Sequence, residues 1–313
     1  MTMKTEKDRF CHVFIPSYHR PKNIKTAVYL KKIGWDMERV TVFVDDEAGD
    51  VEQYEEMAKE LGFNVHVFRM EEARTRYDYV HRASVSRRSA GQARNMFQDF
   101  AASMGIDFYV VMDDDTCAFN TFMQRHTMKD TDLVRRTFNA MEDLMRKRKI
   151  GVFGLSQTGD FIGGYQPRIF LRKVMNTTFY LLPYIYRGER GVQDNDTSLF
   201  TGICNEGLFT GTLNHALVLQ QVVSATQEGG LTDLYNECKL LNKSLVTVIQ
   251  FPSAIIAEHQ KLNGGRLHHR INYKHLAPCI IKGEKERDNI AWDKWPEDYP
   301  FTNENKVVGH KRD

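Results

Sequence analysis

Three consecutive aspartates, Asp113 to Asp115, have the residue type and position that most clearly suggest chemistry. They follow FYVVM at 108–112, an apolar run rich in valine and aromatic residues that is typical of a buried strand. Ligands of open α/β sheets bind beyond the carboxyl ends of the strands. Adjacent carboxylates need a countercharge, and hard oxygen ligands of this kind suit Mg²⁺ or Mn²⁺, which in turn hold a diphosphate. The alternative is an acidic turn that begins the next loop.

The composition indicates an ordinary globular protein. The 313 residues are 42% hydrophobic and 27% charged, and the formal net charge of +2 gives no strong case for nucleic acid. Five cysteines without a CxxC spacing indicate neither a disulfide framework nor a zinc site. The N-terminus lacks an apolar signal region, and no run approaches the roughly 18 apolar residues of a membrane helix. We therefore expect a cytoplasmic protein without a membrane partner.

Strand and helix signals alternate through the first part of the chain. Apolar periodicity predicts strands at 11–17, 39–46, 64–68 and 108–112, and helices at about 21–33, 49–61 and 87–104. This βαβαβαβ pattern predicts a largely parallel, nucleotide-binding type of sheet.

The second half is less regular. We expect a helix at 131–148, strand-like segments at 150–156, 167–173 and 178–186, helical stretches near 213–226 and 231–242, and a last strand at 245–251. Such a mixture predicts a sheet extended by antiparallel strands. No linker divides the chain, so we expect a single domain over 1–313. Its parts are a donor-binding half at about 10–116, an acceptor-side half at about 117–285 and a tail at 286–313.

Several short motifs together resemble a known family. They are IPSYHRP at 15–21, VDD at 44–46, GQARN at 91–95, MDDD at 112–115, QDND at 193–196 and HQKLNGG at 259–265. In this order they resemble GT-A fold glycosyltransferases, and more narrowly those associated with phage DNA hypermodification, sometimes encoded beside TET-type oxygenases. The resemblance implies an α/β fold of GT-A type, with helices on both faces of the sheet, and a hexosyl- or pentosyltransferase.

The resemblance also implies how the donor is bound. Asp113 and Asp115 would hold Mn²⁺ or Mg²⁺, with Asp114 facing the donor sugar or ribose. The donor, a UDP-sugar, would be contacted by residues after the first, second and third expected strands: Ser17, Tyr18, Arg20, Asp45, Arg94 and Asn95. Arg87 lies two turns before Arg94 on one side of the expected helix. A solvated helix face is the alternative for both arginines.

A base and a third metal ligand are implied by the same resemblance. The acidic pair of the acceptor side appears here as Gln193-Asp194, which makes Asp194 the expected catalytic base and Asp196 the alternative. A helix-capping loop would account for the same residues. His259, expected at a strand end, resembles the late histidine of the metal shell, although a structural histidine is the other interpretation.

Lys261 and Arg266 flank a glycine pair that would allow the backbone to approach the donor phosphates.

The implied acceptor is a hydroxymethylated pyrimidine in DNA, such as hydroxymethylcytosine, or a sugar already attached to it. The interleaved arginines and tyrosines of 74–88 suit a nucleic acid, and they would equally suit a basic loop that closes over the diphosphate. If the chain is phage-encoded, it would act in the host cytoplasm. A glycan acceptor, or a non-catalytic sugar- or nucleotide-binding module, is the alternative.

Two other enzyme classes place aspartates after strands. A haloacid-dehalogenase-like phosphotransferase needs Thr or Val where Cys117 stands, and its motif follows the first strand rather than the fourth. A two-metal nucleotidyltransferase would leave IPSYHRP and ARN without a role.

Overall fold

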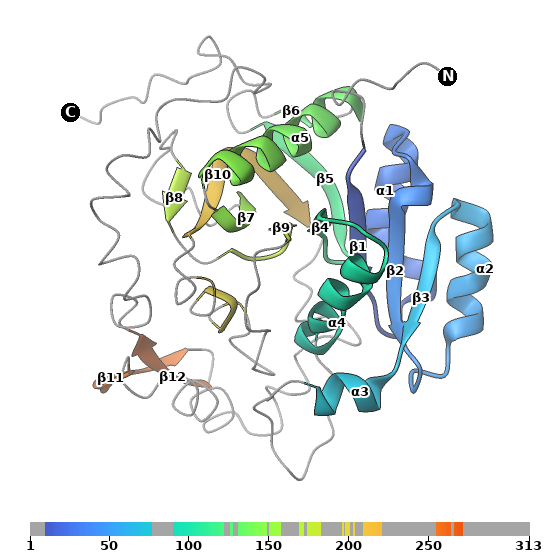
Figure 1. Ribbon diagram of the computed structural model, residues 1–313. Helices are drawn as coiled ribbons and strands as arrows, with labels where there is room; N and C mark the ends of the chain where they lie inside the picture. Colours follow the sequence, from blue (N-terminus) through green and yellow to red (C-terminus); the bar gives the residue numbers. More distant parts are fainter. Residues whose placement is uncertain are drawn as a thin grey trace.

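The computed structural model describes residues 10–76, 90–121, 126–127, 131–148, 150–157, 169–171, 174–182, 196, 198–200, 203, 209–220, 255–263 and 266–271. These residues form one large mixed sheet with helices on both faces and a separate two-stranded sheet (Figure 1).

The first half of the chain builds the parallel part of the large sheet. Its strands are β1 (His12–Pro16), β2 (Val40–Asp45), β3 (Asn64–Phe68) and β4 (Phe108–Val111). They lie in the order β3-β2-β1-β4, and each neighbouring pair is parallel. All six residues of β2 are buried, as expected for a strand covered on both faces. The predicted fold class, an α/β protein with a mostly parallel first half, is confirmed.

Alternation along the strands divides the helices between two layers. The helices are α1 (Lys25–Ile33), α2 (Val51–Leu61), α3 (Met70–Thr75), α4 (Ala90–Ser103) and α5 (Thr131–Arg148), with short 3-10 turns η2 (Pro21–Asn23) and η3 (Met37–Arg39). Val13 and Ile15 of β1 belong to the apolar cluster shared with α1, α2 and α5. Phe14 belongs to the opposite cluster, which includes residues of α3 and α4.

The second half extends the same sheet beyond β4. Its strands are β5 (Thr116–Thr121), β6 (His126–Thr127), β7 (Ile150–Ser156), β8 (Ile169–Leu171), β9 (Thr178–Leu181) and β10 (Phe209–Gln220). β9 joins β4 in antiparallel orientation, and the order continues β9-β7-β10-β5-β6, with β8 also paired to β10. The start of β9 therefore lies beside the carboxyl end of β4, where Thr178 pairs with Val111.

The helix predicted near 213–226 is wrong, because β10 occupies residues 209–220. Leu213, Ala216 and Leu219 have the spacing of a helix face, which misled the prediction. In the fold this segment pairs with β7, β8 and β5, and it is apolar because it is enclosed. The predicted helix at 231–242 and strand at 245–251 lie outside the described residues.

A hairpin that the sequence did not predict forms the second sheet. It consists of β11 (Ile255–Asn263) and β12 (Arg266–Ile271), which pair in antiparallel orientation. The register shifts between Ile256 and Gln260.

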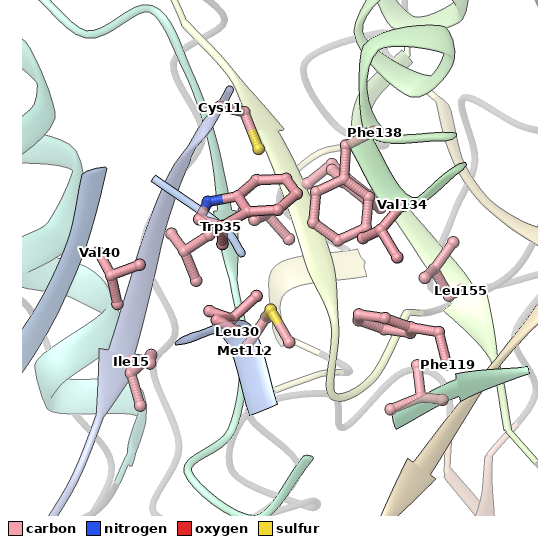
Figure 2. Packing of buried hydrophobic residues seen from close by; sticks show 14 of the residues in the cluster. Cys11, Ile15, Leu30, Trp35, Val40, Met112, Phe119, Val134, Phe138 and Leu155 are labelled. Carbon is pink, nitrogen blue, oxygen red and sulfur yellow. The ribbon is translucent and has the colours of Figure 1, made fainter. Parts of the chain in front are cut away.

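An aromatic cluster packs the two halves of the chain together on the face of the sheet that α1, α2 and α5 cover. Phe138 of α5 is 1% exposed, and its ring centre lies 5.4 Å from that of Trp35, 5.6 Å from Phe119 and 4.9 Å from Phe179. Figure 2 shows Phe138 beside Trp35, with Leu30 and Phe119 in the same cluster. This packing holds α5 against β5 and β9, the strands that carry Phe119 and Phe179.

Within the part of the chain that the structure describes, no helix combines the length and the apolar character needed to cross a membrane.

We expect Phe138→Ala to lower the free energy of unfolding by about 3–5 kcal/mol, because it removes a buried ring and leaves a cavity between the halves. Urea denaturation followed by tryptophan fluorescence measures the change. Val28→Ala is the control, since Val28 is 50% exposed on α1 and its truncation should change stability by less than about 0.5 kcal/mol. A loss below about 1 kcal/mol for Phe138→Ala would contradict this assignment of the core.

Candidate functional site

The carboxyl ends of three neighbouring parallel strands bring the expected site residues to one edge of the sheet. Ser17 follows β1, Asp45 ends β2 and Asp113 comes two residues after β4. Backbone bonds hold these ends together: Ser17 N donates to Phe43 O at 3.1 Å, and Met112 N donates to Phe14 O at 3.0 Å. The edge is where open α/β sheets bind their ligands.

The three aspartates face different partners. Asp113 Oδ1 accepts a hydrogen bond from Arg94 Nη2 of α4 at 2.6 Å, and the two side chains are 18% and 15% exposed. Asp114 and Asp115 are only 5% and 2% exposed. Asp113 is therefore the member of the triplet that is most open to a ligand.

Asp114 is tied to the loop after β1. Its Oδ2 accepts from Ser17 Oγ and its Oδ1 from Arg20 Nη1, both at 2.9 Å. Burial is the largest influence on this carboxyl and raises its pKa, while the charge of Arg20 and the bond from Ser17 oppose that effect. The expectation from sequence had Asp114 facing the donor sugar or ribose; in the structure both of its oxygens are directed to this loop.

Tyr54 of α2 completes a directed chain of hydrogen bonds. Its hydroxyl lies 2.9 Å from Ser17 Oγ and accepts from Arg20 N at 3.0 Å. Because Ser17 uses its single proton on Asp114, Tyr54 must donate to Ser17. Burial raises the pKa of Tyr54 to about 12, so the phenol keeps the proton that this bond requires at neutral pH. Arg20 is therefore linked to Asp114 in two ways. Its guanidinium bonds to the carboxylate directly, and its backbone amide is connected to it through Tyr54 and Ser17.

Thr26, at the start of α1, holds the backbone of the triplet. Its hydroxyl donates to Asp113 O and accepts from Thr116 N at 3.0 Å, while Thr26 N donates to Asp114 O at 3.2 Å. Thr26 is fully buried, so water cannot replace its side chain as the partner of these backbone groups. The direction of the three carboxylates is set by this anchored turn.

Two more expected donor contacts lie beside the loop after β1. Tyr18 is half-buried against the core, with its ring centre 3.9 Å from that of His19. His19 has a positive φ of 54°, and its Nδ1 lies 3.2 Å from Asp50 Oδ2 at the start of α2. Asp45 is 4% exposed and accepts from Glu47 N at 3.0 Å, which orients its carboxylate at the end of β2.

The remaining predicted residues divide between the described and undescribed parts of the chain. Asn95 is fully buried in α4, next to Arg94, and Asp196 is half-buried. Arg87 and Asp194 lie outside the described residues. Of the arginines in the 74–88 segment, Arg74 pairs with Glu47, and Arg76 pairs with Glu72 and Asp99.

His259, Lys261 and Arg266 lie in the hairpin. The prediction that His259 stands at a strand end is wrong, since β11 continues to Asn263. His259 falls where the register shifts, and Arg266 begins β12 opposite Asn263. The glycine pair at 264–265 is outside the described residues. The described contacts do not join the hairpin to the triplet.

The residues at the strand ends fit a hard divalent cation. Among the described residues no group of three or more His, Cys, Asp or Glu side chains forms a ready metal site. Mg²⁺ and similar ions need fewer protein ligands than that, because one or two carboxylates are completed by water and substrate phosphates. Asp113 and Asp115 carry carboxylate oxygens of the type that such an ion prefers.

Sequence reasoning missed three residues that position the triplet. Tyr54 falls within the helix predicted at about 49–61 without being expected at the site, and neither Thr26 nor Gln220 is among the predicted site residues. Gln220 Nε2 donates to Asp115 Oδ1 at 2.7 Å from the end of β10. A polar residue that interrupts an apolar face was the available signal for Thr26, whereas nothing local marked Gln220.

We expect Tyr54→Phe to lower the free energy of unfolding by about 1–3 kcal/mol, because Arg20 N loses its acceptor and Ser17 Oγ its donor. Amide hydrogen exchange measured by NMR should show faster exchange at Arg20. Tyr29→Phe is the matched control, since it removes a buried hydroxyl that bonds to the Phe119 backbone away from this loop. Equal exchange at Arg20 in both variants would contradict the chain of bonds described here.

Comparison with solved structures finds remote similarity. The glucosyl-3-phosphoglycerate synthase of Mycobacterium tuberculosis, in complex with Mn²⁺ and UDP-glucose, gives a TM-score of 0.44 at 14% identity, covering 85% of this chain and 87% of that chain. A cytidylyltransferase from Leptospira borgpetersenii gives a TM-score of 0.32 at 17% identity, covering 55% of this chain and 60% of that chain. No curated protein matches the sequence.

The sequence of the chain matches a protein family directly. The profile of the family TAGT, described as TET-Associated Glycosyltransferase, matches residues 11–230. This span is more than half of the 313 residues and contains the aspartate triplet, Arg94 and Gln220. The chain therefore belongs to the TET-associated glycosyltransferase family and is a glycosyltransferase.

Proposed function

We propose that the protein moves a sugar from a UDP-sugar to a hydroxymethylated pyrimidine in DNA, or to a sugar already on that base, in a reaction that depends on Mn²⁺ or Mg²⁺. The observation that carries the donor part is the pairing of Asp113 with Arg94 at the carboxyl end of β4. A carboxylate and a guanidinium, both partly exposed, are placed side by side where a ligand of this type of sheet binds.

The charges of this pair suit a diphosphate leaving group. Asp113 and Asp115 would hold the divalent ion, which when bound supplies Lewis-acid stabilisation of the departing nucleoside diphosphate. Arg94 approaches Asp113 from α4 and is 15% exposed, so it can share the charge that develops on the leaving phosphate. Lys261 and Arg266, with His259 as a further metal ligand, are proposed to approach the same phosphates from the hairpin.

The nucleoside would lie over the ends of β1 and β2. Tyr18 offers a half-buried aromatic ring there, and the Asp45 carboxylate is oriented at the neighbouring strand end. A carboxylate of this kind can accept hydrogen bonds from the uracil or the ribose. Ser17 and Arg20, which hold Asp114, keep the loop in place beneath the nucleoside.

On the acceptor side, Asp194 or Asp196 would remove the proton of the attacking hydroxyl. The DNA acceptor is supported chiefly by the family, whose name associates it with TET oxygenases. Arg74 and Arg76 add little support, because each already pairs with an acidic side chain of the protein.

Asp113→Asn tests the metal and the donor site. The amide keeps the shape of the side chain and removes its charge, so we expect sugar transfer to fall at least about 100-fold and Mn²⁺-dependent UDP binding to disappear. Activity assays and calorimetric titration of UDP with and without Mn²⁺ measure both effects. EDTA should reproduce the loss in the wild-type enzyme, and added Mn²⁺ should reverse it.

Asp99→Asn is the matched control for this variant. It removes another carboxylate that pairs with an arginine, at 2.9 Å from Arg76, but it lies outside the site. We expect its transfer rate to stay within about twofold of the wild-type rate, since exposed ion pairs contribute little. Undiminished Mn²⁺-dependent UDP binding by Asp113→Asn would rule out the proposed metal site.

The acceptor is tested with three duplexes of one sequence that contain cytosine, methylcytosine or hydroxymethylcytosine. With Mn²⁺ and a panel of sugar nucleotides, we expect a sugar adduct only on the hydroxymethylated duplex, detected by mass spectrometry of the digested nucleosides. Transfer to a glycan and to none of the duplexes would reject the DNA acceptor while leaving the donor site intact. If no nucleoside diphosphate is released under any condition, the chain is better explained as a binding module.

A further inference from the structure

We propose that Asn176 and Gln220 are positioning residues that hold Asp115 in the orientation that binds the divalent ion. The inference rests on the proposed function, because it assigns a role to two residues toward the same metal. It names a part of the site that comes from the acceptor-side half of the chain.

The two residues form a relay of hydrogen bonds that ends on Asp115. Asn176 Nδ2 donates to Gln220 Oε1 at 2.9 Å, and Gln220 Nε2 donates to Asp115 Oδ1 at 2.7 Å. Asn176 and Gln220 are half-buried, whereas Asp115 is 2% exposed. A short bond from an amide to a buried carboxylate is among the stronger hydrogen bonds of a protein, so it fixes the side chain that receives it.

Strand pairing places the relay at the site. Gln220 is the last residue of β10 and pairs with Thr116, the residue after Asp115. A register irregularity falls between Leu219 and Gln220, at the point where the side chain turns to the triplet. Asn176 comes two residues before β9, whose first residue pairs with the end of β4.

Asn176 determines which end of the Gln220 amide faces Asp115. A glutamine amide can be turned over, and its oxygen would then repel the carboxylate. The donor of Asn176 engages Oε1, which leaves Nε2 to point at Asp115. Because Gln220 is neutral, it orients the carboxylate without adding a positive charge that would oppose a cation.

The backbone at Asn176 has a conformation that suits asparagine. Its φ is 61°, a left-handed conformation that asparagine adopts more readily than most residues, and Thr178 Oγ1 donates to its carbonyl oxygen at 3.2 Å. These features belong to the backbone of the turn, and the side-chain amide of Asn176 is oriented separately, by its bond to Gln220. Residues that orient a metal ligand in this way typically change metal affinity by about 10–100-fold when they are removed.

The test uses the full-length protein with Gln220→Met and Asn176→Gly. Methionine keeps the length of the side chain without the amide, and glycine keeps the left-handed backbone without the side chain. Binding of Mn²⁺, alone and with UDP, is measured by electron paramagnetic resonance of the free ion, and urea denaturation reports the fold. We expect each variant to bind Mn²⁺ about 10-fold more weakly, and the double variant to be no weaker than Gln220→Met, because the two residues act in series.

Thr178→Val is the control for the turn itself. It removes the bond to the Asn176 carbonyl oxygen but leaves both amides, so its Mn²⁺ affinity should match that of the wild-type protein. Wild-type affinity in Gln220→Met, or an equal loss in Thr178→Val, would overturn the inference and leave a purely structural role. A wild-type protein that binds no Mn²⁺ with or without UDP would instead reject the proposed metal site, and the positioning role with it.

Discussion

Repulsion among three adjacent carboxylates is the constraint on which the rest of this site depends. Asp113, Asp114 and Asp115 follow one buried strand, and two of them are almost completely removed from water. Such charges persist in a protein only when they are hydrogen-bonded and compensated. The compensation comes from different elements: Arg94 on α4, Ser17 and Arg20 after β1, and Gln220 on β10. Thr26 on α1 fixes the backbone between them. The elements that meet at the end of β4 therefore supply the partners that allow three adjacent carboxylates to lie there.

The partners differ in charge, and this gives the three aspartates different roles. Arg20 and Ser17 enclose Asp114, so this residue joins the end of β4 to the loop after β1. Arg94 meets Asp113 at the more open position, where an incoming ligand can compete for either group. A neutral amide holds Asp115. A sequence of three identical residues thus yields three distinct environments, because each side chain leaves the turn in a different direction.

Apolar periodicity along the sequence was enough to predict several of the helices and strands. The segments 64–68, 131–148 and 150–156 were predicted with the bounds that the structure gives to β3, α5 and β7. All seven residues of β7 are buried, whereas in β3 only Phe68 is. β10 was mistaken for a helix because its apolar residues reflect enclosure between strands far away in sequence. The triplet and Arg94 were found from the sequence, and the structure shows them in contact. Gln220 was not predicted as a site residue, because its contacts depend on the pairing with Thr116 and on the bond from Asn176, which local sequence does not show. Tyr54 lies in a predicted helix, but the bonds of its hydroxyl to Ser17 and Arg20 are not encoded by apolar periodicity.

The bond between Gln220 and Asp115 spans 105 residues of sequence, which has a consequence for synthesis. During translation β1, β2, β3 and β4 emerge first and can pair with one another, but residues 209–220 are still to be made. A nascent chain that stops before β10 would carry the aspartate turn without the amide that holds its last member. The acidic residues are therefore synthesised well before Gln220, which bonds to the last of them. A truncated chain that ends before β10 would therefore carry Asp115 without the bond from Gln220, although Arg20 and Arg94, the partners of Asp114 and Asp113, would already be present.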